Sequence, residues 1–274
     1  MGDIQFLQEM ARKVRIDSLK AIHKAKSGHP GGSLSAADIL TVLYFYKMRI
    51  NPKSPKWPDR DRFILSKGHA APAAFAVLAH RGFFPLEDLD TLRKIDGKLE
   101  GTVNINTPGG DMTVGSLGQY LSVGIGMALA GRIDKKDYKV YILLGDGELQ
   151  EGQVWEAAMS AAHYKLGNLI AILDNNKVQQ TGKTEEIMDL NHPDDKFKAF
   201  GWRVLQMNGH NIQEIIETLD SIPNDPWAAP TMIIANTIKG KGVSFMEGKA
   251  DWHGGAPSDE QLALALEELG EKNL

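Results

Sequence analysis

The feature that most constrains the fold is a set of short aliphatic runs, each followed by a cluster of polar residues. The runs occupy residues 63–65, 140–144, 169–173, 204–207 and 232–234, and longer stretches with helical spacing separate them. Apolar side chains fill both alternating positions, as in strands that are covered on both faces of a parallel sheet. The pattern predicts an α/β fold: a doubly wound, mainly parallel sheet with helices on both faces.

Helical spacing is clearest near the two ends of the chain. Apolar or small residues recur at helical intervals over residues 4–26, and this run stops at the glycine-rich segment 27–32. Ser35 and Asp38 have the spacing of a capping box before the apolar stretch 39–46, so a second helix is predicted to begin there. Residues 258–269 are predicted to form a closing helix.

Length and composition limit what the chain can be. With 274 residues, 42% of them apolar, it can bury one large core, and we expect one domain over residues 1–274. No apolar run approaches the roughly 20 residues of a membrane-spanning helix, so membrane insertion is not expected. The chain has no cysteine, which excludes disulfides and thiolate chemistry and makes the cytoplasm the expected location.

The charge balance says how an anion could be bound. The formal net charge is -4, with acidic and basic residues interspersed, so nucleic acid is not an expected partner. An anionic ligand must instead be held by local groups, such as helix N-termini, histidines or a bound cation.

Polar residues that follow two neighbouring runs have the chemistry of a metal site. Asp146 lies in Gly145-Asp146-Gly147 after one run, and Asn176 follows the next run along the chain. The carboxyl ends of parallel strands open on one edge of the sheet, so the two side chains can converge. One carboxylate and one amide oxygen suit Mg²⁺, or Ca²⁺ as a substitute, and Mg²⁺ commonly adds phosphate oxygens. The alternative is that Gly145-Asp146-Gly147 is an ordinary turn at the end of a strand and binds no metal. The presence of Asn176 at the end of the next strand argues against this alternative.

These motifs, and others in the same order, resemble the transketolase family. The resemblance rests on Gly-Asp-Gly with Asn-Asn about thirty residues later and on four segments: 27–31, 66–70, 115–119 and 145–157. It covers nearly the whole chain. It implies the diphosphate-binding domain of a thiamine diphosphate-binding fold, with thiamine diphosphate and Mg²⁺ as cofactors.

The resemblance also implies roles for individual residues. Asp146, Asn176 and the carbonyl of Val178 would bind the metal. The implied cofactor-binding residues are Gly115, Ser116, Leu117, Gly147, Glu148, Asn176, His69 and His253. The implied catalytic residues are His29, His69, His253 and Glu151, of which Glu151 would link two cofactor sites across a dimer interface with Glu156 in the same network. An imidazole titrates near neutrality and can both donate and accept a proton. We expect the other histidines, His23, His80, His163, His192 and His210, to pack or cap.

The implied reaction is transfer of a two-carbon ketol unit from a ketose phosphate to an aldehyde acceptor. The family's pyrimidine-binding domain, whose glutamate activates the cofactor, and its C-terminal domain have no counterpart in this chain. We therefore expect a partner subunit that supplies the pyrimidine-binding domain, in an α2β2 assembly. A truncated piece of a longer chain is the alternative.

Two positions depart from the family pattern. Thr102 stands where the family has a histidine that meets the donor's hydroxyls, and Tyr120 stands where it usually has glycine. These changes suggest a non-standard sugar, such as a modified, branched or sulfonated one. Two rival functions remain: a thiamine diphosphate enzyme of the deoxyxylulose phosphate synthase type, and a cofactor-binding module without catalysis.

Overall fold

A single parallel sheet organises the chain in a computed structural model that describes residues 3–271. Its five strands lie in the order β1-β2-β3-β5-β4, and every neighbouring pair is parallel. The strands are β1 (Arg62–Leu65), β2 (Val140–Gly145), β3 (Leu169–Asn175), β4 (Arg203–Asn208) and β5 (Thr231–Asn236). All five predicted strands are thus present, and the predicted parallel α/β fold is confirmed.

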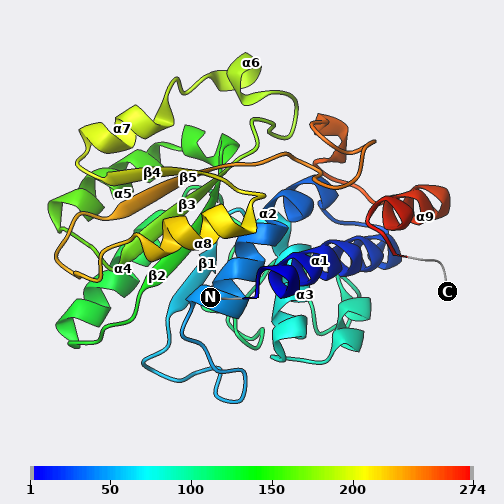
Figure 1. Cartoon of the computed structure of the whole chain (residues 1–274), viewed down its shortest axis with the longest axis horizontal. Helices are drawn as coiled ribbons and strands as arrows, with labels where there is room; N and C mark the ends of the chain where they lie inside the picture. The colour runs from blue at the N-terminus through cyan, green and yellow to red at the C-terminus, as the bar shows by residue number, and fades with distance from the viewer. Residues whose placement is uncertain (1–2, 272–274) are drawn as a thin grey trace.

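Helices cover both faces of the sheet, which is the doubly wound arrangement. On one face α2 (Pro30–Val42) packs against α8 (Ile212–Asp220), with α1 (Ile4–Ala25) and α3 (Ala71–Arg81) beyond them. On the other face α4 (Tyr120–Ile133) packs against α5 (Gly152–His163), and Figure 1 shows the sheet between these two groups. The remaining helices are α6 (Thr184–Met188), α7 (Pro193–Ala199) and α9 (Asp259–Glu268).

The central strands are buried on both faces, but one predicted strand is not. All of β2 is buried, as is β3 up to its last residue, so these aliphatic runs form the middle of the core. The expectation of full burial is wrong for β4, where Arg203, Gln206 and Asn208 are exposed and only Met207 is buried. β4 is an edge strand, so it has a neighbouring strand on one side only.

The second helix begins earlier than its predicted cap. Helix α2 starts at Pro30, directly after His29, so Ser35 and Asp38 lie inside the helix and do not cap it. Proline suits the first turn of a helix, because its fixed backbone angle is helical and its missing N–H would have no partner there. The connection from α1 is therefore short, and this places His29 at the helix start. The closing helix α9 does have a capping box, formed by Ser258 and Gln261.

A smaller apolar cluster fastens the C-terminal helix to the rest of the fold. Ile16 and Leu19 of α1 contact Val243 and Met246 of the segment after β5, and Ala265 of α9 completes the contact. No helix in residues 3–271 is both long and apolar enough to span a membrane. A cytoplasmic location stays a prediction.

Candidate functional site

A cavity of about 160 Å³ opens at the carboxyl edge of the sheet, where the predicted site residues converge. It lies where β2, β3 and β5 end, as ligand sites in open α/β sheets do. Nine of the residues that line it are Lys67, His69, Leu117, Asp146, Gly147, Asn176, Val178, Lys239 and His253. The fold therefore brings together the predicted metal ligands and two of the predicted catalytic histidines.

Asp146 is held by backbone donors at the end of β2. Its carboxylate accepts hydrogen bonds from the N–H of Gly147, at 2.8 Å, and from the N–H of Lys177. Burial, and then the negative charge of nearby Asp174, raises the pKa of Asp146. Among residues 3–271, no lysine, arginine or histidine nitrogen lies within ion-pair distance of this carboxylate. A partly buried carboxylate without a cationic partner is suited to neutralisation by a divalent cation.

Asn176 and Val178 supply the neutral oxygens beside Asp146. The side-chain oxygen of Asn176 accepts a hydrogen bond of 3.1 Å from the N–H of Val178, which fixes the turn after β3. The carbonyl of Val178 accepts a hydrogen bond of 2.8 Å from the ammonium of Lys239. The three predicted ligands present oxygen atoms, which fits Mg²⁺. One of them, the carbonyl of Val178, already contacts a positive charge, the ammonium of Lys239.

Lys239 is a site residue that the sequence interpretation missed. Its side chain is buried, and its ammonium also lies 2.9 Å from the imidazole Nδ1 of His253. Burial, and then repulsion by the charge of Lys67, lowers the pKa of Lys239 to about 8. The sequence could have identified Lys239 by its position, because Thr237-Ile238-Lys239 directly follows β5, as the other polar clusters follow their strands.

Three histidines form one cluster, and two of them, His69 and His253, line the cavity. Ring centroids of His29 and His69 lie 5.4 Å apart, those of His29 and His253 5.5 Å, and those of His69 and His253 4.8 Å. Burial is the first cause that lowers the pKa of each, and it keeps the rings neutral near pH 7. The Nδ1 atom of His29 is buried and has no hydrogen-bond partner in the described part of the chain. A buried polar atom without a partner calls for an explanation, and a ligand group is one.

The glycine positions in this region leave room for close approach. A side chain at Gly31 would begin 2.7 Å from the carbonyl of Trp252 and 2.9 Å from Cγ of Lys239, so only glycine lets α2 lie against this segment. Gly118 has a backbone φ of +82° and would place a side chain 2.6 Å from Cβ of Glu151. These two positions shape the cavity by backbone contact.

Glu148 connects the walls of the cavity by hydrogen bonds. Its buried carboxylate accepts from the hydroxyl of Ser66, from the N–H of Gly118 at 2.9 Å and from the N–H of Gly145 at 3.0 Å. Burial raises the pKa of Glu148. These bonds tie the 115–118 segment to the end of β2, while contact with a cofactor stays a prediction.

The 115–118 segment is also held by Tyr120, one of the two departures from the family pattern. The hydroxyl of Tyr120 accepts a hydrogen bond of 3.1 Å from the N–H of Ser116. Leu117 is partly exposed and lines the cavity, whereas Gly115 and Ser116 are not among its lining residues. The cofactor-binding role implied for Gly115 and Ser116 stays a prediction.

Thr102, the other departure, follows a glycine that lies against Arg93. A side chain at Gly101 would lie 3.5 Å from the guanidinium of Arg93, and that guanidinium donates a hydrogen bond of 2.9 Å to the hydroxyl of Ser27. Burial, and then the charge of Arg93, lowers the pKa of His29. Thr102 itself is half-buried.

The two predicted network carboxylates do not reach the cavity in this chain. Glu151 and Glu156 are exposed, at the start and on the first turns of α5. Their predicted role across a dimer interface stays a prediction.

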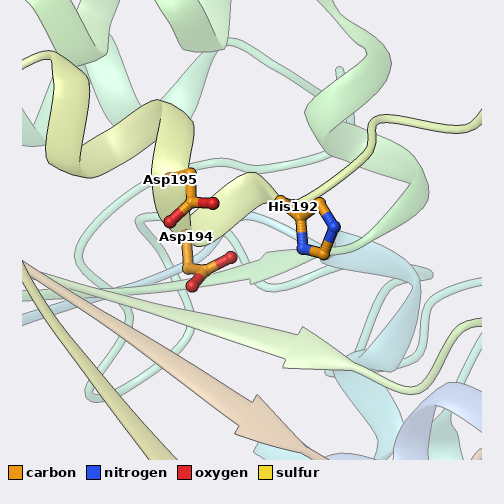
Figure 2. A group of neighbouring side chains, drawn as sticks. All are labelled: His192, Asp194 and Asp195. Atoms are coloured by element: carbon orange, nitrogen blue, oxygen red, sulfur yellow. The ribbon is translucent and has the colours of Figure 1, made fainter.

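Several histidines expected to pack or cap are engaged elsewhere. His23 contacts Asp259 at 2.7 Å and His80 contacts Asp17 at 2.6 Å, while His210 contacts Asp38 at 2.8 Å. His192 lies beside Asp194 and Asp195 at the start of α7 (Figure 2), with their ligand atoms within 4.8 Å of one another. Both carboxylates already pair with Lys198, at 3.0 and 3.1 Å.

The neutral state of His253 leads to a pH prediction. Burial, and then the charge of Lys239, lowers the pKa of His253 to about 3, whereas an unfolded chain has a histidine pKa of about 6.5. Between these values only the unfolded state binds the proton, so the stability that this group contributes is present above pH 6.5 and is lost as the pH falls toward 3. We expect NMR titration of the His253 ring to show no midpoint between pH 5 and 8. A midpoint near 6.5 in the free protein would contradict this assignment.

Comparison with known proteins agrees with this geometry. Residues 7–273 match the sequence profile of the family described as transketolase, thiamine diphosphate binding domain. The chain is 46% identical to an apulose-4-phosphate transketolase subunit of Phocaeicola vulgatus, over 98% of this chain and 95% of the relative. It is also 46% identical to the 6-deoxy-6-sulfo-D-fructose transketolase subunit SqwG of a Clostridium species, over 96% of each chain.

Full-length relatives match over part of their length. Human transketolase is 43% identical over 92% of this chain, which corresponds to 40% of the human protein. The crystal structure of transketolase from Campylobacter jejuni superposes with a TM-score of 0.90 at 36% identity, over 98% of this chain and 43% of that one. The chain thus spans about two fifths of these full-length relatives.

Proposed function

Because this chain belongs to the transketolase family and is its thiamine diphosphate-binding domain, we propose that it is the N-terminal subunit of a thiamine diphosphate- and Mg²⁺-dependent transferase. The enzyme moves a two-carbon ketol unit from a ketose phosphate to an aldehyde acceptor. The observation that carries the proposal is the meeting of Asp146, Asn176 and the carbonyl of Val178 with a histidine cluster in one cavity.

The residues present fit the proposed cofactor and metal. Asp146, Asn176 and the carbonyl of Val178 would hold Mg²⁺, as an oxygen set with one negative charge. Gly147, His69, His253 and Lys239 would hold the diphosphate, for which the buried ammonium of Lys239 would be the main cationic partner. When bound, thiamine diphosphate supplies the carbanion chemistry that breaks and forms the carbon–carbon bond.

This chain's own contribution is positioning and proton transfer. His29 has a buried Nδ1 without a partner among the described residues, so it donates to or accepts from a substrate oxygen. The imidazoles of His29 and His253 are neutral near pH 7. His29 is the group proposed to accept a proton in one half-reaction and return it in the next, whereas His253, with a pKa of about 3, is a weaker base suited to hydrogen bonding.

We propose that catalysis needs a partner chain. Two relatives of nearly the same length are named as subunits, while this chain spans only two fifths of the full-length transketolases. The partner is a C-terminal transketolase subunit with the pyrimidine-binding domain and its glutamate, in an α2β2 assembly. Glu151 is exposed beside the 115–118 segment, where a second copy of this chain can reach it.

The experiment that tests this function is an assay of the chain mixed with a co-purified partner chain of the C-terminal subunit type. Ketose phosphate cleavage with transfer to an aldehyde supports the proposal. Consumption of pyruvate would instead identify an enzyme of the deoxyxylulose phosphate synthase type. Cofactor binding without either reaction would identify a non-catalytic module.

The sugar is proposed to be non-standard. The two relatives of subunit length are named for apulose-4-phosphate and for 6-deoxy-6-sulfo-D-fructose, a branched and a sulfonated sugar. Thr102 replaces a histidine of the family pattern that would meet the donor's hydroxyls, so a sugar-facing group would differ while the cofactor residues are kept.

Thr102→His should shift the donor preference. A histidine there restores a hydrogen-bonding group for the hydroxyls of an ordinary ketose, which is worth about tenfold in relative kcat/KM. We expect kcat/KM for xylulose 5-phosphate to rise relative to that for 6-deoxy-6-sulfofructose, measured with the partner chain present. An unchanged ratio would show that position 102 does not select the donor.

A further inference from the structure

His210 lies outside the cofactor cavity, yet its ring is fixed at both nitrogens. It is located in the loop between β4 and α8, and its side chain is 11% exposed. Nδ1 lies 2.8 Å from the carboxylate of Asp38 on α2, and Nε2 lies 2.8 Å from the backbone nitrogen of Ile238 after β5. The ring therefore bridges a helix and the segment that carries Lys239.

The partners of the ring determine its tautomer. The N–H of Ile238 can only donate, so Nε2 of His210 must be the unprotonated acceptor. The proton is then on Nδ1, which donates to Asp38. Asp38 is buried and bonded to the guanidinium of Arg15 on α1, so this end of the bridge is anchored to the helical layer.

The other end of the bridge is the segment after β5, in which three successive residues each form a hydrogen bond to a distant part of the chain. The hydroxyl of Thr237 donates to buried Asp174, and the N–H of Ile238 donates to His210. The next residue, Lys239, extends its ammonium to the carbonyl of Val178 and to His253 in the cavity. The hydrogen bond from the Ile238 N–H to His210 fixes the backbone one residue before Lys239. It therefore helps to fix the position of the Lys239 Cα, from which the side chain extends.

We infer that His210 is a positioning residue of the cofactor site: its Nε2 holds the Ile238 N–H and thereby directs Lys239 at the diphosphate position. Asp38 and Arg15 keep the ring in the tautomer that can accept this bond. The inference rests on the proposed function in one respect, which is that the cavity binds thiamine diphosphate.

His210→Leu tests the inference. Leucine fills similar space but cannot accept a hydrogen bond, so the Ile238 N–H loses its partner. The backbone at Lys239 is then held less firmly. We expect the dissociation constant for thiamine diphosphate, measured by calorimetry on the full chain with saturating Mg²⁺, to rise about tenfold. His210→Gln, whose side-chain oxygen can reach the Nε2 position, should recover most of the affinity.

His80→Leu is the matched control. His80 is 12% exposed and contacts the carboxylate of Asp17, so it loses the same type of histidine–carboxylate bond far from the cavity. This variant should leave the dissociation constant unchanged, even if its thermal stability falls. Equal affinities of His210→Leu and wild type would overturn the inference, as would a loss of equal size in His80→Leu.

A second measurement is independent of cofactor binding. In the wild-type chain, NMR should detect a scalar coupling between the Ile238 backbone nitrogen and Nε2 of His210, because the two share one hydrogen. The side-chain resonances of Lys239 should move in His210→Leu and stay in place in His80→Leu. Absence of the coupling, or unmoved Lys239 resonances, would overturn the inference. A wild-type chain that binds no cofactor would contradict the proposed function alone.

Discussion

Asp146→Ala should lower the rate of ketol transfer by about a thousandfold or more, because Asp146 is the only charged group in the proposed Mg²⁺ ligand set. The remaining ligands, Asn176 and the carbonyl of Val178, are neutral. Without the carboxylate, Mg²⁺ would lose its one charged protein ligand, and cofactor binding that depends on the metal would weaken. The measurement is kcat with the partner chain present, together with the Mg²⁺ concentration that gives half-maximal activity.

The control for this variant is Asp195→Ala. Asp195 is an exposed carboxylate on α7 that pairs only with Lys198 among the described residues. Its removal should leave both kcat and the Mg²⁺ requirement unchanged. If Asp146→Ala kept more than a tenth of the wild-type rate at the same Mg²⁺ concentration, Asp146 would not be a metal ligand.

Lys67→Met should strongly destabilise the fold. The ammonium of Lys67 forms an ion pair with the carboxylate of Asp174, and both side chains are almost completely inaccessible to water. Burial is the largest single influence and raises the pKa of Asp174, but the charge of Lys67 and the hydrogen bonds from Lys67, Ser35 and Thr237 together outweigh it, so the pKa is lowered. Methionine fills similar volume and leaves a buried carboxylate without its cation, which costs about 3–5 kcal/mol. The measurement is urea unfolding at pH 7.

Two further variants separate charge loss from other effects. Lys198→Met removes a lysine from an exposed pair with Asp194 and should leave the urea midpoint nearly unchanged. The double variant Lys67→Met with Asp174→Leu removes both charges and should recover part of the lost stability. Recovery is incomplete because the hydroxyls of Ser35 and Thr237 lose their acceptor on Asp174. A double variant less stable than Lys67→Met would contradict the assignment of the cost to an unpaired buried charge.

Buried lysines supply local cationic groups to a cavity in a chain of net negative charge. Lys67 and Lys239 both line the cavity, and neither has more than 2% of its surface exposed. Lys67 is paired with the carboxylate of Asp174, so Lys239 is the ammonium proposed to meet a diphosphate. A charge held at short range in a buried site does not require a basic surface over the whole protein.

The strand ends were the part of the site that local sequence could predict. Aliphatic runs followed by polar residues indicate parallel strands, and the rule that ligands bind at their carboxyl ends brings Asp146 and Asn176 together. The structure confirms this convergence because β2 and β3 are adjacent in the sheet. The same rule applied to β5 would have included Lys239. The hydrogen bond of its ammonium to the carbonyl of Val178 joins residues 61 positions apart in the sequence, so no local pattern indicates it.

Other features depend on contacts that no local pattern contains. The capping-box spacing of Ser35 and Asp38 predicted a helix start, but both residues have distant partners inside α2. Ser35 donates to Asp174, and Asp38 pairs with Arg15 and His210, so tertiary packing explains residues that resemble a local cap. In the same way, the exposure of β4 follows from its place at the sheet edge, which its apolar sequence does not reveal.

The most direct test of the central claim is a calorimetric titration of the full chain with thiamine diphosphate, with and without Mg²⁺. We predict saturable binding at one site per chain with Mg²⁺, and loss of that binding when the metal is removed by a chelator, because Asp146 and the diphosphate then share no cation. Binding that is absent under both conditions, or equally tight without metal, would contradict the assignment of this cavity.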